Sequence, residues 1–281
     1  MCIRDSTETA LKLAREGIVL LKNNDVLPLK KPQNTKNKIL VTGPNANNQS
    51  ILGDWHKPQP DENVHTIYEG IEKIGTEVGY IVDYHDSNQN IKKISSNDIN
   101  KTIEIANQYD IVFVVVGDNS MRYKWSEKTA GENTARSELN LAGIQLDLVK
   151  RLKETGKKVI VIYANGRPIS EPWISENINA IIEVWEPGSF GGLATAEIIF
   201  GKVNPSGKLP LTIANSVGQL KMFYNHKHSM YYRNYAMNTN KPLYSFGFGL
   251  SYTKFEISDP KLNSSKFKKV RFKCCIFSYK K

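Results

Sequence analysis

The chain has 281 residues, of which 40% are hydrophobic and 23% charged, as in most globular proteins. No apolar run approaches the length of a membrane-spanning helix, so no membrane partner is expected. The formal net charge is +10, but residues 261–281 hold eight basic side chains and no acidic ones. Outside that tail, 30 basic residues are balanced by 28 acidic ones, which gives no basic folded surface for a nucleic acid.

Both ends of the chain depart from the pattern between them. Residues 1–6, MCIRDS, resemble nothing that follows and are interpreted as a non-native start. No apolar leader is visible there, so the localisation stays open. The three cysteines, Cys2, Cys274 and Cys275, have neither disulfide nor zinc spacing.

Strands and helices alternate through the body of the chain. Short apolar runs bounded by Gly, Pro or Asn predict strands, and apolar residues at helical spacing predict helices. In chain order the predicted elements are helix 7–21, strand 38–43, helix 65–75, strand 79–85, helix 95–110, strand 111–117, helix 141–156, strand 157–166, strand 178–188, helix 191–201 and strand 207–213.

This alternation predicts an α/β fold, in which a six-stranded, mostly parallel sheet is sandwiched between helices. Beyond Ser216 an aromatic segment is expected to wrap over the domain and bury its tyrosines. Residues 256–281 begin like the first strand of an all-β module, and the chain ends before such a module is complete.

Four loops follow predicted strands directly and are candidates for a functional site. Sites in open α/β sheets form beyond the carboxyl ends of the strands, and parallel strands would place all four loops at one edge. The loops span residues 43–64, 117–139, 164–170 and 186–192.

The loop at 117–139 is the most distinctive because it interleaves acidic and basic side chains. A carboxyl group held near cations and shielded from water can act as a general acid that protonates a leaving group. Trp125 offers a flat apolar face to a sugar ring. The alternative is a solvated loop whose tryptophan packs against the loop base. The charged residues are Asp118, Glu127, Glu132 and Glu138, with Arg122, Lys124, Lys128 and Arg136.

Other motifs give weaker indications. Asp54 and His56 beside Trp55 suit either a polar ligand or a structural loop. His226 and His228 lack the partners of a metal site. No phosphate-binding glycine loop occurs, and no G-x-S-x-G motif supports a serine nucleophile. Neither a metal nor a cofactor is therefore expected.

Eight motifs follow one another along the chain: REGIVLLKNNDVLPL, GPNA, LGDW, KTAGENTARSELNLAGIQLDLV, NGRPI, VWEPGSFGG, NPSGKLPLTI and LYSFGFGLSYTKFE. In this order they resemble the second domain of family 3 glycoside hydrolases, the β-glucosidase and β-xylosidase type. The resemblance covers about residues 10–256. One motif alone would be weak, whereas the ordered set is highly specific.

The resemblance implies a six-stranded α/β sandwich over residues 7–255 and a truncated fibronectin-III-like domain over 256–281. In the family, an N-terminal (β/α)8 barrel supplies an aspartate nucleophile, and a long loop of the second domain carries the general acid/base glutamate. The matching position is Glu132, in AGEN. This chain contains no barrel, so it is expected to supply half the site of a retaining β-glycosidase for terminal β-linked sugars, and to be inactive alone. Members of the family are often periplasmic or secreted.

The neighbours of Glu132 have open roles. Arg136 either orients or tunes Glu132, or braces the loop, with bracing favoured. Trp125 and Arg136 are expected to bind substrate, with Trp125 a candidate for lining the leaving-group subsite. Glu127 is the rival acid, but it does not match the Gly-Glu step of the family. The alternative function is a non-catalytic carbohydrate-binding or scaffold domain.

Overall fold

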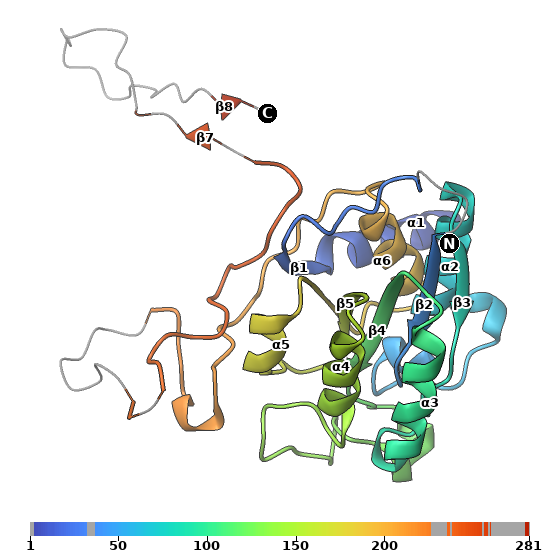
Figure 1. Cartoon of the computed structure of the whole chain (residues 1–281). Helices are drawn as coiled ribbons and strands as arrows, with labels where there is room; N and C mark the ends of the chain where they lie inside the picture. Colours follow the sequence, from blue (N-terminus) through green and yellow to red (C-terminus); the bar gives the residue numbers. More distant parts are fainter. Residues whose placement is uncertain are drawn as a thin grey trace, which may run out of the picture.

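A computed structural model describes residues 3–32, 37–225, 235–236, 238–254, 256–257, 259 and 279–280. Its centre is a six-stranded sheet of order β1-β6-β5-β4-β2-β3 (Figure 1). Five strands run parallel, and β1 pairs antiparallel with β6 at one edge. The predicted α/β class, with a mostly parallel sheet between helices, is confirmed.

The strands are short, four of the five predicted helices lie within about a turn of their observed bounds, and the helix Pro172–Asn177 is not among the predicted elements. The strands are β1 (Val19–Asn23), β2 (Lys38–Thr42), β3 (Ile81–Tyr84), β4 (Ile111–Gly117), β5 (Lys158–Ala164), β6 (Ala180–Trp185), and the small pair β7 (Glu256–Ile257) and β8 (Tyr279–Lys280). The helices are α1 (Ile3–Gly17), α2 (Ile67–Val78), α3 (Ser96–Ala106), α4 (Gln145–Glu154), α5 (Pro172–Asn177) and α6 (Gly191–Ile199). Among the described residues no helix is long and apolar enough to cross a bilayer.

The sheet has a buried core on each face. Helices α1, α2 and α6 pack on one face, and α3, α4 and α5 on the other (Figure 1). Strand β4 is buried at every position and sends alternate side chains to the two cores. This is why its sequence, IVFVVVG, is continuously apolar.

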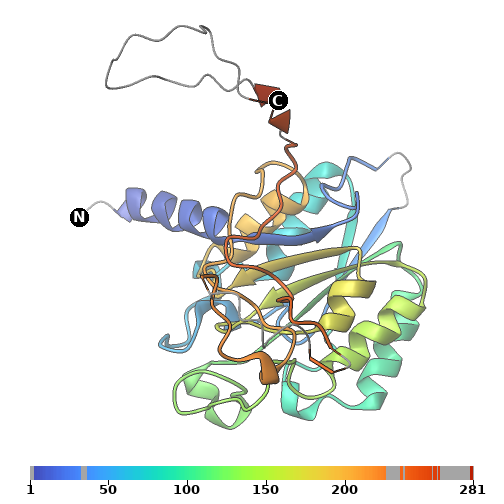
Figure 2. The same cartoon turned by 90° about the vertical axis from the view of Figure 1, so that its left-hand side faces the viewer.

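The carboxyl ends of β2, β4, β5 and β6 lie at one edge of the sheet, as the parallel pairing requires. Strand order reverses between β2 and β4, and the helices that follow them, α2 and α4, lie on opposite faces. The two loops therefore leave the sheet at a topological switch point, where ligands bind in such folds. Figure 2 shows both loops at the same end of the sheet.

The prediction of a single helix over residues 7–21 is wrong beyond Gly17. Residues Val19–Asn23 form β1 instead. Ile18 and Leu21 fit the helical spacing, but Ile18, Val19, Leu20 and Leu21 are all buried. A continuous buried apolar run suits a strand packed on both faces better than an amphipathic helix, and this run covers the edge of β6.

The prediction of a strand over residues 207–213 is also wrong. Ile213 makes one isolated bridge to Tyr244, and the segment does not join the sheet. Pro210 lacks the N–H that a ladder needs. Strand β1 takes the sixth place in the sheet instead.

The aromatic segment beyond Ser216 wraps the domain in part, as expected. Leu250 donates its N–H to the Leu20 carbonyl at 2.8 Å, beside the edge strand β1. Tyr252 is half-buried and donates its hydroxyl to the Ile198 carbonyl at 2.9 Å. Tyr224, by contrast, is exposed. The further β module expected at 256–281 lies mostly outside the described residues and stays a prediction.

Helices α2 and α6 touch through glycines, so a methyl group there should destabilise the domain. A Cβ at Gly70 would lie 2.0 Å from the Gly192 carbonyl oxygen, and backbone cannot move aside cheaply. We expect Gly70→Ala to lower the free energy of unfolding by at least about 1–3 kcal/mol in urea titrations. Gly17→Ala, where nothing lies within 4 Å, should change it by less than about 0.5 kcal/mol. Equal effects of the two substitutions would contradict this packing.

Candidate active-site loop

The loop after β4 is closed at its base by a pair of residues. Asn119 and Thr129 exchange hydrogen bonds: the Thr129 N–H donates to the Asn119 carbonyl at 2.8 Å, and the Asn119 N–H donates to the Thr129 hydroxyl at 2.9 Å. That hydroxyl donates in turn to Asp118 at 3.0 Å. Arg167, from the loop after β5, pairs with the same carboxylate at 2.8 Å. The base is thus tied to a neighbouring strand end.

Glu132 lies beyond this base, in a segment of irregular backbone. Its neighbours Gly131 and Asn133 both have positive φ angles, 99° and 58°, a conformation that glycine and asparagine tolerate best. The Glu132 side chain is 46% exposed. It therefore faces solvent at the edge of the sheet rather than the core of its own domain.

Lys128 is the buried charge beneath Glu132. Its side chain has no solvent exposure, although lysine is rarely buried. Its ammonium donates to both carboxylate oxygens of Asp54 at 3.0 Å and to the Glu132 carbonyl at 3.0 Å. An ammonium has three donors, and all three are satisfied here. The Nζ atom also lies 4.8 Å from the ring centroid of Trp125.

Asp54 joins the loop after β2 to the loop after β4. Its carboxylate accepts from Lys128 and from the Glu132 N–H, the latter at 2.6 Å, and lies 3.5 Å from Arg122. Partial burial raises the pKa of Asp54, but the hydrogen bonds and charges of these donors outweigh it, so the pKa lies below its usual value. Asp54 is thus held as a carboxylate.

Arg122 lies near the exposed tryptophans of both loops. Its guanidinium carbon is 3.7 Å from the ring centroid of Trp55 and 6.0 Å from that of Trp125. The same guanidinium forms an ion pair with the Glu132 carboxylate. Trp55 is 75% exposed and Trp125 50%. Two indoles, a guanidinium and a carboxylate therefore share one surface, which suits a ligand with both hydroxyl groups and apolar ring faces.

Arg136 does not touch the Glu132 side chain among the recorded contacts. It donates to the carbonyl and the side-chain oxygen of Asn140, at 3.2 and 3.1 Å. This contact stays within its own loop, and the role of Arg136 stays a prediction. The residue that pairs with Glu132 is Arg122, one of the loop charges for which the sequence indicates no partner.

A cavity of about 280 Å³ lies beside the Glu132 segment. Its charged lining comes from Asp54, Arg136, Arg167 and Glu186. Burial raises the pKa of Glu186, against the effect of a hydrogen bond of 2.6 Å from Ser120. Arg136 and Gly131, the residue before Glu132, thus border the same hollow.

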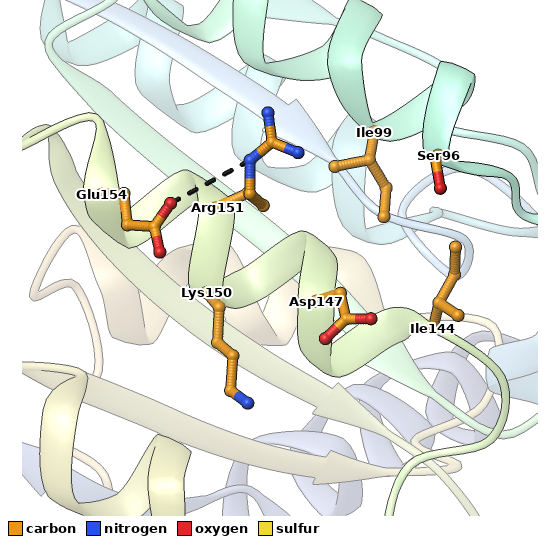
Figure 3. A pocket seen from close by; sticks show the side chains of 7 residues that line it. All are labelled: Ser96, Ile99, Ile144, Asp147, Lys150, Arg151 and Glu154. Atoms are coloured by element: carbon orange, nitrogen blue, oxygen red, sulfur yellow. Dashed lines mark ion pairs between the residues drawn. The ribbon is translucent and has the colours of Figure 1, made fainter.

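A larger hollow, of about 330 Å³, lies between helices α3 and α4 and is distinct from this site. Figure 3 shows that its charged side chains come from successive turns of α4, with Arg151 and Glu154 paired at 4.0 Å. Ile99 and Ile144 supply its apolar part. This groove between two surface helices has no convergent catalytic groups. Its larger volume therefore does not make it the better candidate for a functional site.

A buried carboxyl group supports the loops after β5 and β6. Glu183 is 1% exposed and accepts from the Trp185 N–H at 2.9 Å and from Asn165 at 3.3 Å. Trp185 has a φ of 59°, which a large side chain rarely adopts. Burial raises the pKa of Glu183 to about 8, despite these two hydrogen bonds. Among the described residues no group of three or more side chains could hold a metal ion.

The chain matches one domain of longer known proteins. Residues 18–252 match the model of the glycosyl hydrolase family 3 C-terminal domain. The chain is 35% identical to the periplasmic β-glucosidase of Salmonella typhimurium and 36% identical to a β-xylosidase of Formosa agariphila, over 91% and 92% of its own length. It spans only 36% and 35% of those two proteins.

Solved structures agree with these relatives. A β-glucosidase involved in saponin metabolism, from intestinal bacteria, superposes with a TM-score of 0.80 at 28% identity, over 92% of this chain and 40% of that one. The β-glucosidase of Listeria innocua in complex with glucose gives 0.77 at 27% identity, over 90% and 34%.

The raised pKa of Glu183 predicts a pH-dependent stability. Between about pH 4.5 and 8 the folded state keeps a proton on Glu183 that the unfolded state has released, so stability falls as the pH rises through this window. In urea titrations the wild type should lose up to about 1.4 kcal/mol per pH unit relative to Glu183→Gln. The exposed Glu104→Gln should follow the wild type. Parallel curves for wild type and Glu183→Gln would contradict the prediction.

Proposed function

The chain belongs to the family of glycosyl hydrolase family 3 C-terminal domains, and on this basis we propose that Glu132 is the general acid/base of a retaining β-glycosidase. The nucleophile would lie on an N-terminal (β/α)8 barrel that this chain does not contain. The substrates would be glycosides with a terminal β-linked sugar, as the names of the relatives suggest. The domain would occupy residues 7–255, with residues 256–281 beginning another.

The proposed reaction needs two carboxyl groups on opposite sides of one bond. The barrel carboxylate attacks the anomeric carbon while Glu132 gives its proton to the departing oxygen, and the glycosidic bond breaks. Glu132, now a carboxylate, then takes a proton from water, and that water releases the sugar from the nucleophile. Glu132 ends protonated, ready for the next cycle.

The observation that carries the proposal is the position of Glu132. Its side chain is half-exposed at the carboxyl edge of the sheet while its own segment is tied to the buried pair Asp54 and Lys128. An acid/base that serves a partner domain must be reachable from outside and still fixed in place. Glu127, the rival, lies in the exposed 3₁₀ turn Arg122–Glu127 and has no such support among the recorded contacts.

The exposed indoles of Trp55 and Trp125 are proposed to contact the leaving group of the substrate. Both lie around Arg122, which pairs with Glu132. A sugar or aryl group departing from the protonated oxygen would meet these ring faces first. Arg136, at the neighbouring cavity, would hold the loop or contact a hydroxyl group of the substrate.

The same exposed tryptophans favour the second candidate function, a non-catalytic carbohydrate-binding domain. Aromatic faces alone can bind sugars without any nucleophile. The two functions differ in where affinity should reside: on this chain alone, or on a pocket shared with a barrel.

Glu132→Gln should impair the enzyme most with poor leaving groups, because these need proton donation. The assay joins the chain to the barrel domain of its parent protein and uses aryl β-glucosides and β-xylosides. We expect kcat/KM to fall by about 10²–10⁴-fold with poor leaving groups and little with activated ones. Glu127→Gln is the matched control and should behave as wild type. A uniform loss across leaving groups would remove Glu132 from this role.

Calorimetry on the chain alone should separate the two candidate functions. We expect glucose, xylose and cello-oligosaccharides to bind with Kd above about 1 mM, since most of the sugar pocket would lie on the barrel. Binding in the micromolar range that is lost in Trp55→Ala and Trp125→Ala, but kept in the control Phe223→Ala, would favour the carbohydrate-binding function instead.

A further inference from the structure

We propose that Asp54 is a positioning residue that fixes the backbone of Glu132 and, through Arg122, its carboxylate. This inference rests on the proposed role of Glu132 and names a residue on a different loop, after β2, as its support. In this role Asp54 does not touch substrate. It acts by keeping the loop after β4 in the conformation that presents the acid/base.

The N–H and the carbonyl of Glu132 both hydrogen-bond to one buried ion pair, that of Asp54 and Lys128. The Glu132 N–H donates to Asp54 at 2.6 Å, and the Glu132 carbonyl accepts from Lys128 at 3.0 Å. Lys128 is itself held by both oxygens of Asp54. The peptide groups on either side of the Glu132 Cα are therefore fixed by one carboxylate and one ammonium, without any helix or strand at this position.

The local backbone gives little other support. Gly131 and Asn133 have positive φ angles on either side of Glu132, and the recorded local bond is a turn in which the Thr134 N–H donates to the Gly131 carbonyl at 3.0 Å. A short turn of this kind does not determine a side-chain direction by itself. The loop conformation thus depends on the contact with Asp54.

Gly131 is shaped to admit that contact. A Cβ at this position would lie 2.6 Å from an Asp54 carboxylate oxygen, closer than atoms without a bond can approach. The φ of 99° is also one that side chains with a Cβ rarely adopt. The Gly-Glu step in the sequence therefore has a physical reason: the glycine lets Asp54 reach the N–H of the next residue.

Arg122 links Asp54 to the Glu132 side chain, so Asp54 influences the position of the Glu132 carboxylate as well as its backbone. It lies 3.5 Å from Asp54 and pairs with the Glu132 side chain. One guanidinium shared between two carboxylates takes a position set by both. Asp54, which is only 12% exposed, is the fixed member of the pair, and Glu132 is the exposed one.

A catalytic role for Asp54 itself fits the contacts poorly. Its two oxygens already accept from Lys128 and from the Glu132 N–H, and its side chain is largely covered. A nucleophile or base needs a free lone pair that faces the substrate. Support of the neighbouring loop is the role that these contacts allow.

The first test uses the chain as it is and does not depend on catalysis. Amide hydrogen exchange, followed by NMR, reports how firmly the Glu132 N–H is held. We expect Asp54→Ala and Gly131→Ala to accelerate exchange at Glu132 by at least about tenfold, with the amides of β4 unchanged. Asp61→Asn, an exposed acid on the same loop, is the control. Exchange at Glu132 within twofold of wild type would overturn the proposal.

Asp54→Asn guards against a general loss of folding. It keeps the shape of the side chain and one acceptor oxygen, so it should fold even if Asp54→Ala does not, while weakening the bond to the ammonium. Exchange at Glu132 should then lie between wild type and Gly131→Ala. An Asp54→Asn variant that folds and protects Glu132 fully would also overturn the proposal.

The second test uses the enzyme with its barrel. Asp54→Ala should lower kcat/KM about tenfold or more with poor leaving groups and little with activated ones, and should add nothing in a Glu132→Ala background. A separate, additive loss would show that Asp54 acts independently of Glu132 and would sink the inference. If Glu132→Gln itself leaves the leaving-group dependence unchanged, the proposed function fails, and the exchange result still decides whether Asp54 holds the loop.

Discussion

A fully buried lysine ammonium is costly unless every one of its donors is paired, and this constraint organises the loops at the edge of the sheet. Lys128 meets it with two oxygens of Asp54 and one backbone carbonyl, that of Glu132. The pairing draws together two loops that start at the ends of β2 and β4. Without Asp54, Lys128 would keep a single recorded acceptor in a space closed to water. Loss of this contact is therefore expected to loosen both loops at once.

The fold places this ion pair where it can matter for chemistry. Parallel strands bring the loop origins to one edge, and the reversal of strand order between β2 and β4 sends the following helices to opposite faces. The sheet alone would leave a gap between the two loops at such a switch point. Here Asp54 and Lys128 bridge it, and Glu132 stands on the solvent side of the bridge. A catalytic group that serves a partner domain needs a backbone fixed by its own domain and a side chain exposed to the partner.

The sequence predicted the architecture well because burial leaves a periodic record, and it predicted the side-chain partners poorly because those contacts are long-range. Strand β4 was evident from its continuous apolar run, and the α/β class from alternation. The run Ile18–Leu21 is ambiguous in the sequence because two of its residues also fit a helical spacing. Glu132 is proposed from family resemblance, and its partners lie 10 positions away at Arg122 and 78 positions away at Asp54. The glycine before Glu132 is the one sequence feature that relates to Asp54. Its significance is clear only from the structure, where the Asp54 carboxylate approaches this glycine.

The proposed role of Glu132 is tested most directly by a crystal structure of the full-length parent protein with an unhydrolysed β-glycoside bound. We expect a Glu132 carboxyl oxygen within about 3.2 Å of the glycosidic oxygen and about 5–5.5 Å from the nucleophilic carboxylate. In the same structure the Glu132 N–H should still bond to Asp54. A different carboxyl group at the glycosidic oxygen, with Glu132 turned away from the sugar, would contradict it.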